Sequence, residues 1–407
     1  MNARTASAPQ PRGFANVLVL ATGQALHVSG QSMVVTISGL VGVVLAPKAA
    51  LATLPITAVL FGSLLTAIPA SLLMARIGRR AGFMLGATSV VIGSAIATWA
   101  ISISSFWFFV AGSLVMGFNG GFAPYYRFAA VDQAEAAFKP KAISLVLSGG
   151  VVAAFVGPNL GHWTAESYGN ARFMGSFAVA SCVGGLLVIC LSFLRLPRVQ
   201  RAEHKDAGRP LGKIVRQPEF YVSMIVATVA YATMSLIMTA TPLAMAHHGM
   251  GVNDTATVIS WHVFAMFAPA FFTGSIVARF GPLNVMLAGM AMLALCCAIA
   301  LCGVDFHHFF AALILLGLGW CLCFVAASTL LTECYAPGER AKVQAANDFV
   351  IMTSVAVASA LAGGLLHFVG WPAVQLTAIP FVLASTLVVL VLILSKRHES
   401  PGRGRRT

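Results

Sequence analysis

Polar side chains recur on one face of the first long apolar segment of the chain. Gln24, His27 and Gln31 are spaced three and then four residues apart, within an apolar run from Phe14 to about Leu45. In a helix this spacing places all three on one face. An imidazole and two carboxamides can hydrogen-bond a neutral solute, and imidazole also titrates near neutral pH. Because burial of unpaired polar groups is costly, the question is what this face contacts.

The segments that position such side chains are predicted to be membrane spans. Hydrophobic residues make up 58% of the 407 residues and charged residues 9%, and the mean hydropathy is +0.88. These values are typical of a polytopic membrane protein and exclude an ordinary soluble domain. Apolar runs of about 20 residues predict twelve transmembrane helices, at 14–43, 52–76, 81–103, 105–130, 142–164, 172–195, 218–246, 254–279, 284–303, 307–333, 342–367 and 371–395.

The positions of the basic residues predict the orientation of these spans. With both termini in the cytoplasm, only Lys48 and Arg172 of the 25 Lys and Arg residues fall on the outer side. Short loops rich in Lys and Arg stay in the cytoplasm. The net charge of +13 therefore follows from topology and requires no nucleic-acid partner. The eight cysteines lie in or beside apolar runs and have no zinc-like spacing, so we expect packing roles and no metal or cofactor.

A repeat divides the chain into halves. The loop after the second span reads ARIGRRAGFMLGA from Ala75, and the loop after the eighth reads ARFGPLNVMLAGM from Ala278. Each half has six spans, an even number, so both halves enter the membrane in the same direction and form a parallel repeat. We predict an N-terminal half at 1–195, a cytoplasmic linker at 196–217, a C-terminal half at 218–395 and a basic tail at 396–407.

We call Gln24, His27 and Gln31 the opening stripe. The equivalent positions in the second half of the repeat form another polar stripe, in the seventh span. Its members are Thr228, Tyr231 and Ser235, continued by Thr239. Matched stripes favour a shared central cavity near the midplane, although such groups also hydrogen-bond neighbouring helices. Tyr125 and Tyr126 either line the cavity or anchor their span at the cytoplasmic surface of the membrane. The remaining candidate substrate-binding residues are Asn119, Asn159, Trp261, His262 and Trp320.

Deep carboxylates are missing from the predicted cavity. No Asp or Glu precedes Asp132, so the first four spans contain none. Proton-driven transport normally needs a titrating group near the midplane, for which His27 and His262 are the deeper candidates. Facilitated diffusion is the alternative. A neutral, aromatic lining suits a neutral, planar, polyhydroxylated or heteroaromatic solute.

The loop after the second span resembles the signature of the major facilitator superfamily. The matching residues are Arg76, Gly78, Arg79 and Arg80, whereas Ala75 replaces the usual acidic residue. With the twelve spans, the linker and the repeat, the resemblance covers essentially the whole chain. It implies the major facilitator fold and a transporter that works by alternating access. We also expect a monomer, and no enzymatic activity because the known catalytic motifs are missing from the sequence.

The family's acidic residue helps to latch the two halves on the cytoplasmic side, so its absence leaves that role open. Asp348, at the start of span eleven, is a candidate substitute partner for Arg76 or Arg127. A solvated charge at a helix end is the alternative interpretation.

Two further resemblances concern the transported solute. In span five, Gly157, Pro158 and Gly161 resemble the Gly-Pro-x-x-Gly pattern of proton-coupled drug exporters, and Pro and Gly there permit bending and close packing. The stretches ATLPITAVLFGSLLTAIPASLLMARIGRRAGF and YYRFAAVDQAEAAFKPKAISLVLSGGVVAAFVGPNL look like a bacterial subgroup in which riboflavin uptake has been assigned. They imply uptake of riboflavin or a related flavin across the inner membrane. The alternative is a proton-coupled multidrug or metabolite exporter.

Overall fold

The computed structural model describes residues 11–132, 139–167, 171–196, 208–336 and 339–399. All of the regular elements in these ranges are helices, as the sequence predicted. Helices suit apolar segments of this length because, in hydrocarbon, every backbone polar group must be bonded within its own segment. Residues 197–207 of the predicted linker and 400–407 of the predicted tail lie outside the described residues.

The elements follow one another in two groups along the chain. The first group comprises α1 (Pro11–Leu45), η1 (Ala49–Leu51), α2 (Leu54–Ile77), α3 (Arg79–Ser102), α4 (Phe106–Gly117), η2 (Phe118–Gly121), η3 (Ala123–Tyr125), α5 (Tyr126–Asp132), α6 (Lys139–Thr164) and α7 (Met174–Ser192). The second comprises α8 (Leu211–Ile214), α9 (Pro218–His247), α10 (Val252–Phe267), α11 (Ala270–Phe280), α12 (Pro282–Cys302), α13 (Phe306–Glu333), α14 (Arg340–Phe368) and α15 (Trp371–Glu399).

The predicted number of spans is confirmed, with one span broken. Within the described residues, 11 spans are long and apolar enough to cross a membrane, and α10 with α11 makes a twelfth that is bent by 43°. The break falls at Ala268 and Pro269. Proline lacks a backbone donor and clashes with the preceding turn, which accounts for the bend.

The fourth predicted span is also irregular, because α4 gives way to the 3₁₀ turns η2 and η3 before α5. Hydroxyls of α2 bond the backbone carbonyls at the start of this irregular segment. Ser63 Oγ donates to the Gly117 carbonyl at 2.9 Å, and Thr66 Oγ1 donates to that of Phe118 at 3.0 Å. Irregular backbone at membrane depth is tolerated where protein groups satisfy it in this way.

The two loops that revealed the sequence repeat have the same backbone conformation. Gly78 joins α2 to α3 with φ 89° and ψ 155°, and Gly281 joins α11 to α12 with φ 80° and ψ 151°. Glycine adopts a positive φ without the steric penalty that other residues meet. The repeat is therefore structural, and it places equivalent tight turns in the two groups.

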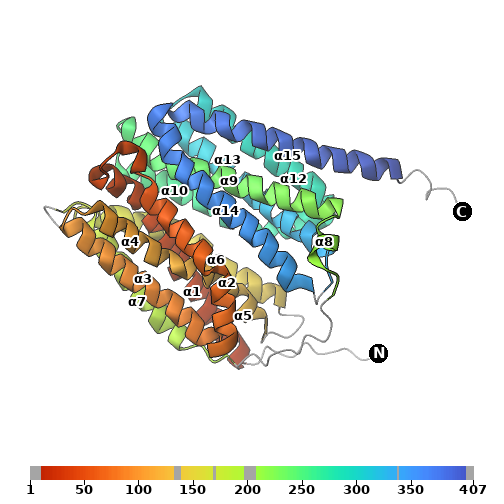
Figure 1. Cartoon of the computed structure of the whole chain (residues 1–407), viewed down its shortest axis with the longest axis horizontal. Coiled ribbons are helices and arrows are strands. Elements are labelled where there is room, and N and C mark those ends of the chain that lie inside the picture. Colours follow the sequence, from red (N-terminus) through yellow and green to blue (C-terminus); the bar gives the residue numbers. More distant parts are fainter. Residues whose placement is uncertain (1–10, 133–138, 168–170, 197–207, 337–338, 400–407) are drawn as a thin grey trace, which may run out of the picture.

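Each group of helices has its own apolar core. One cluster of buried side chains lies within residues 222–392, and two others lie within residues 17–194. A small cluster that includes Val28, Ala153 and Ile259 joins the groups. In Figure 1 the first group, red to yellow-green, lies beside the second, green to blue.

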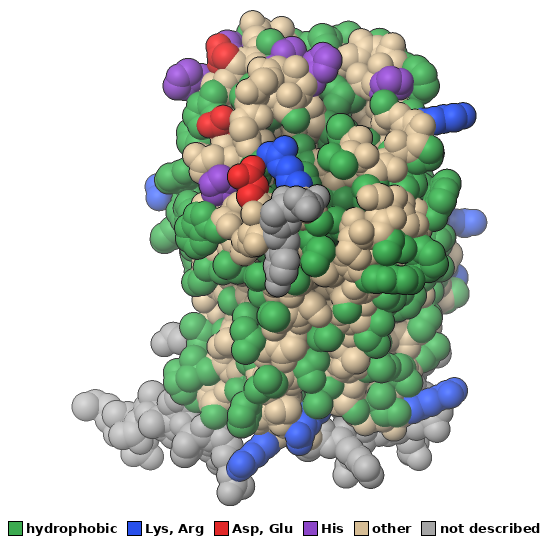
Figure 2. Space-filling model, turned by 90° about the vertical axis from the view of Figure 1, so that its left-hand side faces the viewer, with side chains coloured by type: hydrophobic (Ala, Val, Ile, Leu, Met, Phe, Trp, Pro, Cys, Tyr) green, Lys and Arg blue, Asp and Glu red, His purple; other side chains and the backbone are tan. Residues whose placement is uncertain are grey.

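The outer surface of the bundle is largely apolar. Large hydrophobic side chains are widely exposed, among them Leu72 at 61%, Phe272 at 69% and Leu387 at 61%. Figure 2 shows hydrophobic side chains over much of one face, with histidine and acidic side chains gathered toward its upper end. Apolar exposure on this scale is expected of a surface that faces lipid.

The two groups contact each other closely at the end of the bundle that carries η1. Thr57 Oγ1 on α2 and Thr239 Oγ1 on α9 each lie 3.3 Å from Ser359 Oγ on α14. Toward the other end of α14, where the basic loops lie, Asp348 is exposed and Phe349 is 51% exposed. The bundle is thus closed at the η1 end, while the basic end of α14 is uncovered.

Candidate functional site

His27, from the opening stripe, is held by side chains that follow α4. Asn119 Nδ2 lies 2.9 Å from His27 Nδ1. Because a carboxamide nitrogen only donates, Nδ1 accepts, and a neutral ring then carries its proton on Nε2. The ring of Tyr126, which is fully buried, meets the imidazole edge-on with centroids 6.4 Å apart. The irregular segment η2 therefore positions a partner for His27 from outside α1.

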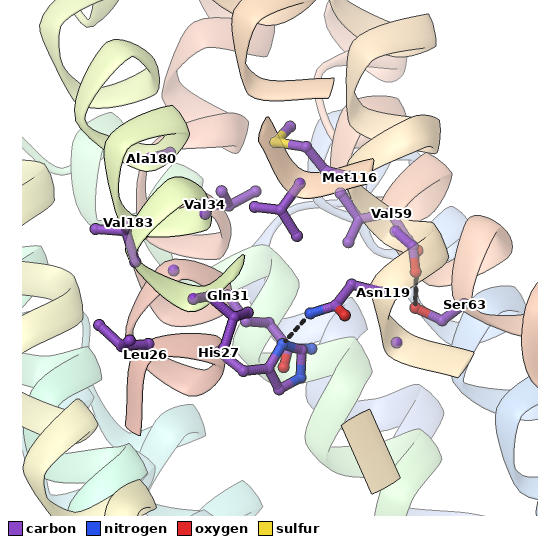
Figure 3. Close-up of a pocket in the computed structure, with 16 residues that line it drawn as sticks. Leu26, His27, Gln31, Val34, Val59, Ser63, Met116, Asn119, Ala180 and Val183 are labelled. Carbon is purple, nitrogen blue, oxygen red and sulfur yellow. Dashed lines mark hydrogen bonds between the residues drawn. The ribbon is translucent and has the colours of Figure 1, made fainter. Parts of the chain in front are cut away.

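A cavity of about 40 Å³ opens beside this pair, within the first group of helices, among α1, α2, α3, α4, η2 and α7. Figure 3 shows His27, Gln31 and Asn119 converging on it, with Ser63 beyond Asn119. The Gln31 side chain is exposed, so the cavity is accessible. Its remaining walls are mainly apolar, formed by Leu26, Val34, Val59, Val90, Met116, Ala180, Val183 and Leu187. This cavity combines neutral hydrogen-bonding groups with apolar walls.

An aromatic cluster occupies the second group of helices. Tyr231 on α9 meets Trp320 edge-on at 4.9 Å and Phe324 at 5.2 Å between ring centroids. Trp320 and Phe324, one helical turn apart on α13, are stacked at 5.2 Å with planes inclined by 9°. Phe267, at the end of α10, lies 6.4 Å from Trp320. We call these four side chains the aromatic cluster.

Several buried polar atoms near these two features lack a hydrogen-bond partner within the part of the chain that the structure describes. They are Asn119 Oδ1 and Tyr126 Oη beside His27, Trp320 Nε1 and Thr228 Oγ1 beside or near the aromatic cluster, and Arg127 Nε. An unsatisfied buried donor or acceptor costs free energy. A bound solute or water can supply the missing partners.

The aromatic cluster contacts the first group of helices through α6. Gly150 on α6 faces the Phe267 ring so closely that an added Cβ would lie 2.6 Å from it. The neighbouring Gly149 packs in the same way against Ala25 on α1. Arg127 on α5 and Asp348 on α14 belong to opposite groups of helices.

Two members of the second predicted stripe bond a neighbouring helix. Ser235 Oγ donates to the Val355 carbonyl at 3.1 Å, and Thr239 contacts Ser359 as described above. Both hydroxyls are buried against α14. Of the opening stripe, Gln24 is half-buried, and Gln31 is the exposed member. Some residues of the two stripes thus hydrogen-bond a neighbouring helix, and others line the cavity.

Three other predicted site residues lie apart from the cavity. His262 is fully buried, and its Nδ1 lies 2.8 Å from the Leu313 carbonyl on α13. Trp261 is 40% exposed and packs on Phe155 of α6 at 5.6 Å. Asn159 Nδ2 donates to its own helix at 2.7 Å. The structure therefore does not bring these residues together with Tyr231 and Trp320.

Apart from Arg127 on α5 and Asp348 on α14, the predicted gating residues lie at two places. Arg76 and Arg80 are exposed and Arg79 is half-buried, around the turn at Gly78. Gly157, which precedes Pro158 in α6, packs tightly on α1: an added Cβ would lie 2.4 Å from the Ser29 carbonyl oxygen. This contact belongs to the packing of α1 against α6.

Sequence reasoning did not single out Phe267, Phe324 or Ser63. Phe324 follows Trp320 by four residues and so shares its helix face, which is a signal that could have found it. Ser63 and Phe267 show no such pattern, because their places depend on how helices from different parts of the chain pack. No group of three or more potential metal ligands occurs among the described residues.

Twelve spans in two groups, with a cavity that carries polar side chains in the first group and an aromatic cluster in the second, define the chain as a multi-pass membrane transporter. The sequence profile described as Major Facilitator Superfamily matches residues 20–230 and 223–407. The chain belongs to this superfamily.

Particular relatives agree with this assignment. The chain is 42% identical over 384 residues to the riboflavin transporter RfnT of Brucella anthropi, covering 94% of this chain and 96% of that one. It is 30% identical to the uncharacterized MFS-type transporter YddS of Bacillus subtilis, covering 77% and 76%. The crystal structure of the nucleoside transporter NupG superposes with a TM-score of 0.73 at 11% identity, covering 93% and 99%, which shows the shared fold.

Proposed function

We propose that this protein takes up riboflavin or a closely related flavin across the bacterial inner membrane. The observation that carries the proposal is the 42% identity to a riboflavin transporter, which extends over nearly the full length of both chains. The site supports it independently. A flavin joins a planar heteroaromatic ring to a hydroxylated chain; the first group of helices offers neutral hydrogen-bonding groups, and the second offers aromatic faces.

The substrate-binding residues in this proposal come from both groups of helices. They are Gln24, His27, Gln31 and Asn119 from the first group and Thr228, Tyr231 and Trp320 from the second, with Phe267 and Phe324 added by the structure. The fixed charges near them are those of Arg127 and Asp348, on opposite groups. Opposite charges that neutralise each other are compatible with a neutral solute.

Transport proceeds by alternating access, in which the two groups rock about the central site. The proposed halves are residues 1–195 and 218–395, joined by the linker. With both termini in the cytoplasm, as the basic loops indicate, the η1 end faces outward and the described conformation is closed to the outside. Arg76, Gly78, Arg79, Arg80, Arg127 and Asp348 then lie at the inner gate. The protein acts as a monomer, without enzymatic activity and without a nucleic-acid partner.

One observation favours a proton-coupled exporter as the second candidate. The Gly157–Pro158–Gly161 pattern resembles that of proton-coupled exporters, and it lies where α6 packs on α1. Asp348, an exposed carboxylate at the inner gate, is a group that could exchange a proton with the cytoplasm.

Growth of a riboflavin-auxotrophic bacterium at limiting riboflavin tests the proposal. Expression of this protein is expected to restore growth at a vitamin concentration at which cells with the empty vector do not grow. An unchanged vitamin requirement, with the protein present in the membrane, would contradict uptake. A pH electrode in the cell suspension distinguishes the mechanisms, since proton-coupled import alkalinises the medium and facilitated diffusion does not.

A further inference from the structure

We propose that His27 is the site at which this transporter binds a proton from the outer side, so that flavin uptake is coupled to proton entry, and that Asn119 switches this site. The proposal rests on the proposed function for the solute. It goes further by naming the coupling ion, the atom that binds it and the residue that responds to it.

His27 lies at the depth at which coupling ions bind in transporters built from two repeats, which is near the midplane. It is half-buried near the middle of α1, and it is the one titratable side chain among the described residues that line the cavity. A water molecule needs roughly 10–15 Å³ of such space, so the cavity of about 40 Å³ can hold water beside the ring. Gln31, on the same face, is exposed. Water can therefore carry a proton to and from His27.

The hydrogen bond from Asn119 makes His27 a two-state group. In the described conformation Asn119 Nδ2 donates to His27 Nδ1 at 2.9 Å, so Nδ1 carries no proton and the ring is neutral. A proton that binds to the Nδ1 lone pair turns this acceptor into a donor, and two donors cannot bond each other. Half a turn of the Asn119 carboxamide brings Oδ1, which is buried without a partner in the described chain, to accept from Nδ1–H.

The protonated state replaces a neutral hydrogen bond with a charge-assisted one, which is the stronger kind. The proton on Nε2 stays in place throughout, and the ring gains one positive charge. When the bound proton returns to water, the lone pair on Nδ1 is restored and the carboxamide turns back. One proton therefore enters and one leaves in each cycle.

Asn119 lies in the irregular part of the fourth span, so its rotation acts on a segment that is not locked into a regular helix. It is 1% exposed within η2, and hydroxyls of Ser63 and Thr66 on α2 bond carbonyls at the start of this segment. On the other side, a Cβ added to Gly86 of α3 would lie 2.7 Å from Asn119 Oδ1. Short 3₁₀ stretches within helices often mark functional hinges. Proton binding at His27 is thereby linked to the packing of α1, α2 and α3 around η2.

The described conformation agrees with this cycle. It is closed at the η1 end, where Thr57 and Thr239 approach Ser359, and its imidazole is neutral. A closed outer end with an empty proton site is the combination expected after a proton has been released to the cytoplasm.

Tyr126 is the titratable side chain that the structure places against the imidazole, edge-on with centroids 6.4 Å apart. The next residue, Arg127, lies over the Phe128 ring at 4.9 Å. Since a phenol ordinarily loses its proton only at about pH 10, His27 is the member of this pair that can exchange a proton in the cell.

The other helices that pack on α1 are α2, α6, α7, α9 and α10. Cys190 of α7 bonds the Val19 carbonyl, two turns before His27, and His262 of α10 bonds the Leu313 carbonyl on α13. Tyr231 of α9 meets the rings of α13. The remaining titratable or charged side chains that the structure describes on these helices are exposed or lie toward helix ends: Arg76, His162, Cys182, Glu219, Tyr221, His247 and Asp254.

Proteoliposomes with an imposed pH difference test the coupling. The outside is made one pH unit more acidic than the inside, and potassium with valinomycin holds the membrane potential at zero. One proton per flavin then supports about tenfold accumulation of labelled riboflavin, whereas facilitated diffusion supports none. The steady-state level does not depend on the rate, so weaker flavin binding alone does not lower it.

His27→Gln keeps a polar side chain beside Asn119 but cannot bind a proton. We expect this variant to equilibrate riboflavin without accumulation. His262→Gln is the matched control, because it replaces the other buried histidine within a span, and it should accumulate riboflavin as the wild type does.

Asn119→Asp is the second variant, for the case in which His27→Gln transports nothing. A neighbouring carboxylate favours the protonated imidazole, so the external pH at which uptake is half-maximal should rise by about one unit. An unchanged midpoint in Asn119→Asp overturns the proposal.

The other outcomes decide as follows. Accumulation by the wild type and His262→Gln, with mere equilibration by His27→Gln, supports the proton site. Equilibration by the wild type, full accumulation by His27→Gln, or equal losses in both histidine variants overturns it and leaves flavin uptake in place. No riboflavin uptake by the folded wild type contradicts the proposed function, and the proton site falls with it.

Discussion

Thr57 and Ser359 lie with their hydroxyl oxygens 3.3 Å apart, and this contact joins α2 of the first group to α14 of the second. Thr239 on α9 approaches the same Ser359 hydroxyl at 3.3 Å. The three side chains form a polar bridge at the η1 end, which is the closed end of the bundle. In alternating access, this bridge must break whenever the transporter opens to the outside.

Thr57→Val is therefore expected to favour the outward-open state. The variant keeps its shape but loses a hydrogen bond worth about 1 kcal/mol, which shifts the ratio of the two states roughly fivefold. Pulsed electron paramagnetic resonance between spin labels at Val44→Cys and Phe368→Cys measures the separation of the groups, after exposed Cys182 and Cys302 are replaced by Ser.

Thr98→Val is the matched control for this experiment, because Thr98 bonds only its own helix, at 2.8 Å to the Ser94 carbonyl. It should leave the distance distribution as in the wild type. If Thr57→Val also left it unchanged, the polar bridge would have no part in closing the outer end.

A second prediction concerns an ion pair between Arg209 of the linker, whose side chain is 48% exposed, and the buried Glu339. Arg209 donates Nε and Nη2 to the two carboxylate oxygens of Glu339 at 3.0 and 2.8 Å, and Glu339 is 2% exposed. The Arg209 hydrogen bond is the main reason that the pKa of Glu339 falls from 4.5 to about 2. The ionised carboxylate thus stabilises the fold above pH 4.5, and this contribution is lost as the pH falls from 4.5 toward 2.

Glu339→Gln should lower the Tm at pH 7, and the difference from the wild type should shrink as the pH falls below 4.5. Thermal unfolding in detergent across this pH range measures it. Glu166→Gln provides the comparison, since Glu166 and Arg172 form an exposed pair at 3.6 Å that contributes little. Equal effects of the two substitutions at pH 7 would show that the Arg209 pair is no more important than a surface contact.

The third prediction tests the inner gate. Asp348 on α14 and Arg127 on α5 carry opposite charges on opposite groups. Their attraction should grow when the inner end closes, so Asp348→Lys is expected to slow transport by about tenfold or more. The exchange Arg127→Asp with Asp348→Arg should recover part of the rate in an uptake assay. Additive losses in the exchanged pair would instead indicate two independent solvated charges.

The fourth prediction separates the aromatic cluster from the other tryptophan within a span. Trp320→Leu is expected to raise the KM for uptake by about tenfold, because it removes the ring that Tyr231 and Phe324 contact. Trp261→Leu should change the KM less than about twofold, since Trp261 is 40% exposed and packs on Phe155. Kinetics of labelled riboflavin uptake measure both. The reverse order of effects would place the substrate beside Trp261, where α10 packs on α6.

The sequence was sufficient to predict the spans because each is a long apolar run bounded by polar residues. It did not indicate that Ala268 and Pro269 would divide the eighth span, nor that η2 would interrupt the fourth. These breaks depend on partners elsewhere in the chain, such as the Ser63 hydroxyl that bonds the Gly117 carbonyl.

The site was predictable only in part, for a related reason. Periodicity places Tyr231 and Ser235 on the same helix face, but it does not reveal which helix that face contacts. In the structure Tyr231 meets Trp320 on α13, whereas Ser235 bonds the backbone of α14. The pairing of His27 with Asn119 likewise depends on how α1 packs against the turn after α4.

Initial rates of labelled riboflavin uptake into proteoliposomes test the central claim most directly, with the wild type beside Tyr231→Ala and Gln31→Ala. We expect saturable uptake by the wild type, a loss of about tenfold in Tyr231→Ala and a smaller loss in Gln31→Ala. Uptake no faster than in protein-free liposomes, with folded protein present in the membrane, would contradict the assignment of this transporter to flavin uptake.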